Sequence, residues 1–216
     1  MSKVITYIEL AAFFSSLMAW PVIKRSSYLR LFPLLLFVVI SVEVYQTFLR
    51  PDGVHINALV YNVQVPLQHL LYLYILFLAL DRRAFKKIMA VVTSVFFAFA
   101  IITAIFFTAP DRFNVLAYCI GSVCIITGIL LKFYEMLQNP TDFNFLKKPF
   151  FYMLFAFLLF NVGTLPYFAM SNWLYFVQQY ENMLQILISV MSVFNYVLYS
   201  TYTIAFLWMT LKKDFS

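Results

Sequence analysis

The chain has 216 residues, of which 64% are hydrophobic and only 11% are charged, with a formal net charge of +6. Soluble domains average roughly 45–50% apolar and about 25% charged residues, so this composition leaves too little polar surface to cover a globule in water. We therefore expect an all-α membrane protein, and we assign the positive charge to its loops rather than to a nucleic-acid-binding face.

Seven apolar runs are long enough to cross a hydrocarbon core about 30 Å thick as helices. In chain order they are 4–23, 28–49, 58–80, 88–107, 113–136, 149–170 and 183–211. Turn-forming residues separate several of them, at 51–53, 81–83, 110–112 and 139–142. The first run is interrupted by Glu9 and no A-x-A site follows it, so we expect a retained helix rather than a signal peptide. Residues 1–216 are thus predicted to form a single domain, a polytopic bundle of seven transmembrane helices.

Lysine and arginine gather in alternate connections, and this bias predicts the orientation of the bundle. One side would carry Lys24, Arg25, Arg30, Arg82, Arg83, Lys86, Lys87, Lys132, Lys147, Lys148, Lys212 and Lys213, and the other only Lys3, Arg50 and Arg112. Loops rich in Lys and Arg stay in the cytoplasm. We therefore expect the N-terminus outside and the C-terminus in the cytoplasm of a cell membrane.

Helix packing should rely mainly on aromatic side chains, because 26 phenylalanines and 15 tyrosines stand against only four glycines. One exception is a stripe of small residues at helical spacing, Ala117, Gly121, Cys124 and Gly128, where another helix can approach closely. The two cysteines, Cys119 and Cys124, point to different sides of one helix and should not form a disulfide.

Polar side chains inside the predicted spans are the candidate functional residues, because a polar group in hydrocarbon is costly. Seven of the nine acidic residues fall at predicted helix ends or in loops, whereas Glu9 and Glu43 fall within helices. At a rise of about 1.5 Å per residue, both lie roughly 6–10 Å below the outer surface. The predicted ligand-binding set is Glu9, Glu43, Gln46, Asn62, Gln68, His69, Asn161, Asn195 and Tyr196. We expect an outward-opening pocket with Glu43 as its main charged contact and Glu9 near its mouth, above an apolar and aromatic inner half.

Each of these residues also has a structural interpretation. Amides and phenols in membrane helices often only hydrogen-bond across helices, at about 0.6 kcal/mol each. A single residue such as His69 is more often a satisfied interior histidine than a ligand, and Glu9 can extend its carboxylate to the outer interface. The clustering of the set is therefore stronger support for a site than any one member.

Catalytic, metal and cofactor functions find little support in the sequence. Retinal-binding pumps need a lysine in the last helix, and 183–211 contains none. Seven-helix zinc amidohydrolases and adiponectin-receptor-like proteins need three metal histidines, whereas this chain has only His55 and His69. No nucleophile–base pair or phosphate-binding glycine loop occurs. We therefore expect neither an enzyme nor a bound metal or cofactor.

The run Tyr61–His69 (YNVQVPLQH) resembles the third helix of small, uncharacterised seven-helix proteins of Bacteroidota-type bacteria. In those proteins an apolar-Pro-apolar step precedes a carboxylate, and Gln68 stands at that place in this chain. The helix count and general layout are also similar to the seven-helix sensing regions of bacterial signalling kinases. The first resemblance implies no established activity, and the second implies signalling.

Three functions remain open. The first is a sensor or receptor-like module that binds a small ligand and signals through a membrane or cytoplasmic partner protein. The second is a small-solute transporter, although Pro33, Pro66 and Pro166 do not fall at matching places in two repeated halves, as in three-plus-one-plus-three transporters. The third is a structural or assembly subunit of a membrane complex. We favour the sensor, in the lipid bilayer of a bacterial-type inner membrane.

Overall fold

The computed structural model describes residues 3–49, 57–106, 113–138, 145–176 and 181–212, which form an all-helical bundle. The α-helices are α1 (Lys3–Met18), α2 (Trp20–Ile23), α3 (Phe32–Val44), α4 (Asn57–Ala79), α5 (Arg83–Phe106), α6 (Val115–Gln138), α7 (Pro149–Phe176) and α8 (Glu181–Leu211). Two short 3₁₀ helices, η1 (Leu29–Leu31) and η4 (Phe145–Lys147), precede α3 and α7, and a π-helical turn, η2 (Tyr45–Leu49), continues α3.

Six helical stretches of the described chain are long and apolar enough to cross a membrane. They are Leu29–Leu49, Leu59–Ala79, Arg83–Phe106, Val115–Gln138, Pro149–Met170 and Ser189–Leu211. The first helix, α1, has 16 residues and is not among them. The chain is thus a helical, multi-pass membrane protein, as its composition predicts.

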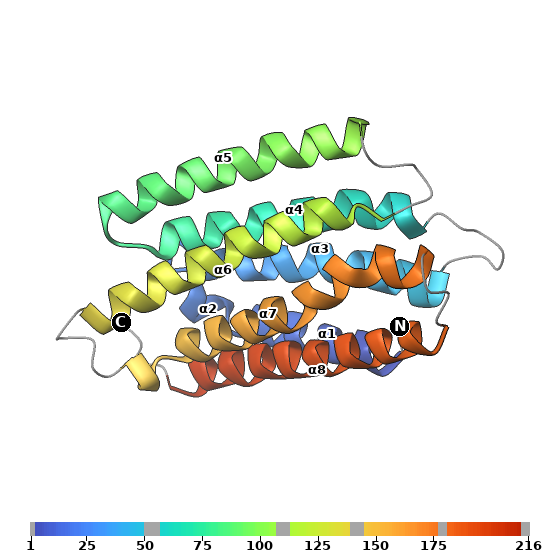
Figure 1. Cartoon of the computed structure of the whole chain (residues 1–216). Coiled ribbons are helices and arrows are strands. Elements are labelled where there is room, and N and C mark those ends of the chain that lie inside the picture. The colour runs from blue at the N-terminus through green and yellow to red at the C-terminus, as the bar shows by residue number, and fades with distance from the viewer. Residues whose placement is uncertain (1–2, 50–56, 107–112, 139–144, 177–180, 213–216) are drawn as a thin grey trace.

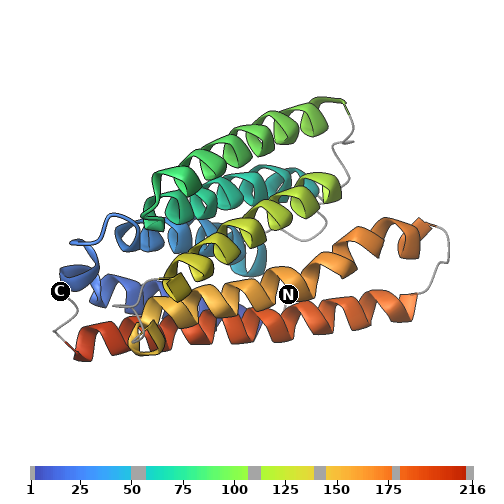
Figure 2. The same cartoon turned by 60° about the vertical axis from the view of Figure 1, so that its left-hand side comes forward.

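The packing of the helices on one another describes a closed ring in chain order, which consists of α1, α3, α4, α6, α7 and α8. Helix α1 packs on α3, α3 on α4, α4 on α6, α6 on α7 and α7 on α8, and α8 returns to pack on α1 (Figures 1 and 2). Helix α5 lies outside this ring against α4 and α6, at the top of Figure 1. Only 22% of the α5 span is buried within the protein, so α5 presents most of its apolar surface outward.

Aromatic side chains fill the inside of the ring, as the sequence predicts. Phe32 of α3 meets Tyr202 and Phe206 of α8 edge-on, with ring centroids 5.6 and 5.9 Å apart. Tyr72 of α4 stacks on Phe157 of α7 at 3.7 Å. Offset and edge-on ring pairs contribute roughly 0.5–1.5 kcal/mol each beyond their buried area.

The predicted small-residue stripe on α6 is confirmed. An added Cβ at Gly121 would collide with the His69 ring of α4, and one at Gly128 would come within 2.9 Å of Leu76 of α4 and Met89 of α5. These two glycines therefore allow α4 and α5 to pack closely on α6. A third close contact was not predicted: a Cβ at Gly163 of α7 would collide with the Phe194 ring of α8.

The helix boundaries depart from the predicted spans at three places. The run 4–23 breaks at Ala19 between α1 and α2, where Pro21 occupies the first turn of the second helix. Helix α5 begins at Arg83 rather than at the predicted residue 88, because Arg and Lys form helices readily and continue this one beyond its apolar run. Helix α7 continues to Phe176, past the predicted end at 170. The predicted turn at 81–83 is confirmed as the short break between α4 and α5, and those at 51–53, 110–112 and 139–142 lie outside the described residues.

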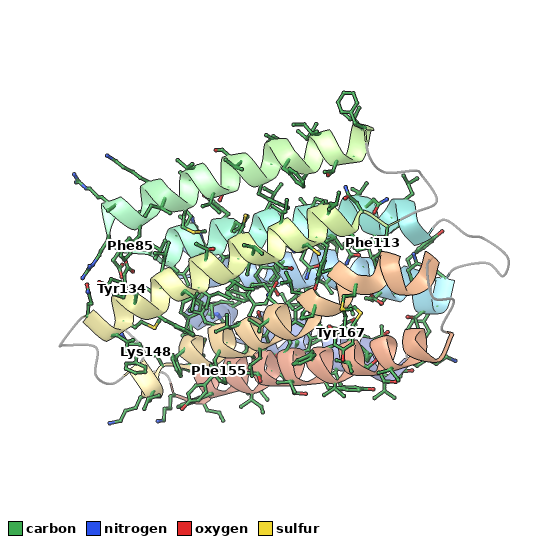
Figure 3. All side chains as sticks on the ribbon, in the orientation of Figure 1. Phe85, Phe113, Tyr134, Lys148, Phe155 and Tyr167 are labelled. Atoms are coloured by element: carbon green, nitrogen blue, oxygen red, sulfur yellow. The ribbon has the colours of Figure 1, made fainter. Side chains whose placement is uncertain are left out.

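Basic residues mark one end of the bundle. The chain leaves α2, α4, α6 and α8 at this end, which we call the basic end. It carries Lys24, Arg25, Arg82, Arg83, Lys86, Lys87, Lys147, Lys148 and Lys212. Figure 3 shows Lys148 there, near Phe85 and Tyr134.

A buried carboxylate holds the basic end together. Glu135 of α6 is 1% exposed and accepts hydrogen bonds from the backbone N–H groups of Asp81 (3.1 and 3.0 Å) and Arg82 (2.7 Å). The Lys132 ammonium lies 3.2 Å from Glu135 and 2.8 Å from Asp81. Glu135 thus binds the free backbone N–H groups of the α4–α5 turn, and Lys132 neutralises its charge.

We predict that Glu135→Gln lowers the thermal stability of the purified protein. An amide presents one acceptor oxygen where the carboxylate presents two, and it leaves the buried Lys132 ammonium with Asp81, whose side chain is 76% exposed, as its remaining counter-charge. Breaking one partner of a buried ion pair typically costs about 3–5 kcal/mol. Thermal unfolding in detergent, followed by tryptophan fluorescence, measures the change against Gln138→Ala, an exposed position at the same end of α6. Equal midpoints for the two variants would show that this network does not stabilise the fold.

Candidate functional site

Two buried carboxylates face each other in the half of the bundle opposite the basic end. Glu9 of α1 is 2% exposed and Glu43 of α3 is 5% exposed, and the two charges repel each other across the α1–α3 contact. Glu9 therefore lies inside the protein and does not extend to the interface. Glu43 accepts a hydrogen bond from the Tyr61 hydroxyl at 3.2 Å, whereas Glu9 Oε2 has no hydrogen-bond partner among the described residues.

The backbone changes its geometry directly after Glu43. The α-helix gives way to the π-helical turn η2, and Thr47 of this turn shares a 3.2 Å hydrogen bond with Thr6 of α1. Single π-helical turns of this kind occur frequently at functional sites, because the wider turn redirects side chains. This hydrogen bond joins α1, which carries Glu9, to the turn that continues α3, which carries Glu43.

A row of tyrosines leads from the carboxylates toward the middle of the bundle. Tyr199 of α8 is 3% exposed and interacts electrostatically with both Glu9 and Glu43. Its ring meets Tyr202 at 6.2 Å, and the Tyr202 hydroxyl lies 3.3 Å from that of Tyr72 on α4. The row ends on apolar rings, because Tyr202 contacts Phe32.

One face of α4 lies along this row. Tyr61 and Gln68 are seven residues apart and so share a face, and Gln68 interacts with the Tyr72 hydroxyl as Tyr61 does with Glu43. Gln64 lies between them, one turn from each, and is 6% exposed. Its carbonyl oxygen Oε1 has no hydrogen-bond partner among the described residues. The carboxylates, tyrosines and this amide together form what we call the carboxylate site.

A second polar group occupies the neighbouring face of α4, toward α6. Asn62 and His69 are again seven residues apart and share this face. The Asn62 side chain accepts a 2.8 Å hydrogen bond from the backbone N–H of Asn114. The side chain of Asn114 in turn caps α6, because its oxygen accepts a 3.0 Å hydrogen bond from the N–H of Ala117. The Asn114 amide also donates to Thr103 of α5 at 2.9 Å. Asn62 thus belongs to the junction of α4, α5 and α6.

His69 is buried in that second group. Its Nδ1 lies 2.7 Å from the Val65 carbonyl of its own helix, and its ring packs on Gly121, Phe96 and Tyr118. The Tyr118 hydroxyl continues to Thr164 of α7 at 2.6 Å. Because Nδ1 faces a carbonyl oxygen it must carry the proton, which makes Nε2 an acceptor. No described residue bonds to Nε2.

The other predicted ligand-binding residues are spread over several elements. Asn161 of α7 is 2% exposed and donates to the Phe157 carbonyl of its own helix at 2.8 Å. Asn195 of α8 is 5% exposed and lies one turn from Tyr199, which puts it beside the carboxylate site. Gln46, in η2, and Tyr196, on α8, are half-buried and both interact with other groups of the protein. The predicted set is therefore not one cluster: part of it belongs to the carboxylate site, part to the second polar group, and Asn161 to neither. Its role in ligand binding stays a prediction.

The half of the ring toward the basic end is closed by apolar side chains. Phe32, Leu36, Leu73, Leu76 and Phe206 are each at most 2% exposed and belong to one continuous hydrophobic core. The hydroxyl groups at this depth on α1, Ser15 and Ser16, donate to carbonyls of their own helix. This half of the ring is thus mainly apolar and aromatic, with the Glu135 network at its end, and that it faces the cytoplasm stays a prediction.

The described residues contain no group of three or more His, Cys, Asp or Glu side chains that could hold a metal ion. Glu9, Glu43 and His69 are divided between the two polar groups described above, so they do not form such a site. The site instead combines two carboxylates, and among the described residues no Lys or Arg side chain pairs with them, although the N-terminal ammonium of the chain interacts with Glu43.

Several residues of these networks were missed from the sequence. Tyr61 shares the periodicity of Gln68, which was the available signal for its place beside Glu43. The pair Lys132 and Glu135 has the i, i+3 spacing of an ion pair, but their position near a helix end concealed that Glu135 is buried. Asn114 directly precedes an apolar helix, and this position was the available signal for its hydrogen bond to the helix N-terminus as an N-cap.

Comparison of the chain with models of known protein families, with curated proteins and with solved structures found no match. The resemblances of the Tyr61–His69 run and of the general layout therefore stay predictions. We infer the function from the positions and contacts of the residues described above.

We predict that Gly121→Ala destabilises the protein by about 1–3 kcal/mol, the usual cost of overpacking a core. The added methyl group collides with His69 and lies 2.8 Å from Phe96. Thermal unfolding should show a lower midpoint than for Val123→Ala, a residue of the same helix that is 51% exposed. Adding His69→Ala to Gly121→Ala should cost less than the sum of the two single changes. Strict additivity would contradict the close α4–α6 contact.

Proposed function

We propose that this protein is a sensor or receptor-like membrane module that binds a small ligand at the carboxylate site and signals through a partner protein at the basic end. In this proposal the chain crosses a bacterial-type inner membrane seven times. The carboxylate site lies in the outer half, and the basic end lies in the cytoplasm.

The seventh crossing is the first helical segment of the chain. Helix α1 alone spans about 24 Å at 1.5 Å per residue, and α1 with α2 spans about 30 Å, the thickness of the hydrocarbon core. Successive long helices run in alternate directions in Figures 1 and 2, and the N- and C-termini lie at opposite ends. Cytoplasmic retention of basic loops then supports an outer N-terminus and a cytoplasmic C-terminus.

The contrast between the buried carboxylates carries the proposal. Glu135 has a hydrogen bond or ion pair at each oxygen and holds a turn in place, which is a structural role. Glu9 is almost equally buried but has an oxygen without a partner among the described residues, and it interacts unfavourably with another carboxylate, Glu43. A buried polar group without a partner destabilises a fold, so its presence favours a functional role.

The closed inner half supports sensing over transport. A transport route would need polar groups from the carboxylate site to the basic end, whereas Phe32, Leu36 and Phe206 close the ring below Tyr202. A purely structural subunit would need no unsatisfied carboxylate. Helix α8 carries Asn195 and Tyr199 and continues without a break to Leu211, so a change at the site has one rigid element through which to reach the basic end.

Native mass spectrometry of the protein, extracted gently from its own membranes, tests this proposal. We expect a bound polar small molecule, a stoichiometric partner protein, or both. A bare monomer that carries only lipid would contradict the proposal and would leave transport to be tested by flux into liposomes.

We predict that Glu43→Gln lowers the affinity for a cationic or hydroxylated ligand by about tenfold, because it removes one of the two carboxylate charges of the site. Folding should be preserved, because the amide still accepts the hydrogen bond from Tyr61. The control is Ser41→Ala, an exposed position on the same helix, which should bind as the wild type does. Loss of folded protein in Glu43→Gln alone would assign a structural role to Glu43.

A further inference from the structure

The buried polar atoms of the carboxylate site that lack partners have one chemical property in common. Glu9 Oε2 and Gln64 Oε1 are both acceptors, in residues that are 2% and 6% exposed, and neither has a partner among the described residues. Leaving a buried acceptor unpaired costs about 1–3 kcal/mol, and more when the acceptor is charged. What the site lacks is therefore hydrogen-bond donors.

The charge of the site also favours a ligand that donates hydrogen bonds. Glu9 and Glu43 repel each other, and the N-terminal ammonium of the chain interacts with Glu43. The basic side chains of the described residues lie elsewhere: Lys3 is exposed at the start of α1, Lys132 is bound to Asp81 and Glu135, and the remainder lie toward the basic end. Glu43 already has the Tyr61 hydroxyl as a donor. Glu9 is thus the carboxylate that is free to bind a cation.

The walls of the site suit an organic cation better than a metal ion. Tyr61 and Tyr199 place aromatic rings close to the two carboxylates, and the faces of such rings attract ammonium groups. Divalent metals usually take at least three protein ligands of the carboxylate, imidazole or thiolate type, and the described residues hold no such group. A primary ammonium has three N–H donors that can be shared among Glu9, Gln64 and a tyrosine hydroxyl.

We propose that the ligand of the carboxylate site is a small primary ammonium ion, bound through its N–H donors by Glu9 Oε2 and Gln64 Oε1. This inference rests on the proposed function and assigns Glu9, rather than Glu43, as the main charged contact. Glu43 then positions Tyr61 and adds negative charge to the site.

The test is thermal unfolding of the full chain in nanodiscs of zwitterionic lipid, with four probes at equal ionic strength. Ethylammonium has charge and N–H donors, tetramethylammonium has charge without donors, ethanol has a donor without charge, and sodium is a simple cation. We expect ethylammonium to raise the unfolding midpoint with a saturable concentration dependence, because a ligand that binds only the folded state stabilises it. The other three probes should leave the midpoint nearly unchanged.

Variants assign the effect to residues. Glu9→Gln should weaken the apparent affinity for ethylammonium by about ten- to a hundredfold, the usual contribution of a hydrogen bond to a charged group. Gln64→Leu, which leaves both carboxylates in place, should weaken it several-fold, and Ser41→Ala should not change it. If Glu9→Gln yields no monodisperse protein, the Gln64→Leu result decides.

Three results would overturn the inference. Tetramethylammonium or sodium could act as strongly as ethylammonium, ethylammonium could have no effect, or its affinity could be unchanged in Glu9→Gln or in Gln64→Leu. If native mass spectrometry still shows a bound polar molecule, these results reject only the ligand class. If it shows none, the proposed function fails as well.

Discussion

Every buried polar group in a membrane protein must find its partner inside the protein, because the hydrocarbon around it offers none. The two ends of this bundle meet that constraint differently. At the basic end, Glu135 binds the backbone donors of the α4–α5 turn and the Lys132 ammonium, so its charge is fully satisfied. In the other half, Glu43 has the Tyr61 hydroxyl as a donor, whereas Glu9 Oε2 has no hydrogen-bond partner among the described residues. The buried carboxylate at the basic end therefore has all its partners, whereas the carboxylates of the other half lack hydrogen-bond donors.

The ring arrangement explains how both ends can exist in one small bundle. Helices α1, α3, α4, α6, α7 and α8 enclose a core of interlocking rings, and this core separates the carboxylate site from the basic end. Helix α5 stays outside and is fixed through Gly128 and the α4–α5 turn. Rigid packing between the two ends is suited to passing on a change of state rather than a solute, which is why we favour signalling.

Hydropathy was sufficient to predict the long spans, since an apolar run of about 20 residues has few alternatives to a membrane helix. The break at Ala19 and the extension of α7 to Phe176 were not predictable in this way, because both depend on local backbone geometry rather than on polarity. Glu9 and Glu43 stood out from the sequence as charges within apolar runs. The division of α4 into a face with Tyr61 and Gln68 and a face with Asn62 and His69 required the packing of α3 and α6 on either side. Whether Glu135 or Glu9 is satisfied depends on three-dimensional partners, which spacing along one chain does not reveal.

The most direct measurement is an experimental density map of the protein in a lipid bilayer, at a resolution that separates bound molecules from side chains. We expect density that belongs to no protein atom within hydrogen-bonding distance of Glu9 Oε2, together with an apolar core that stays closed between Tyr202 and the basic end. A map in which a protein donor binds Glu9 Oε2 directly, with no such density beside it, would contradict the central claim that this carboxylate is held ready for a ligand.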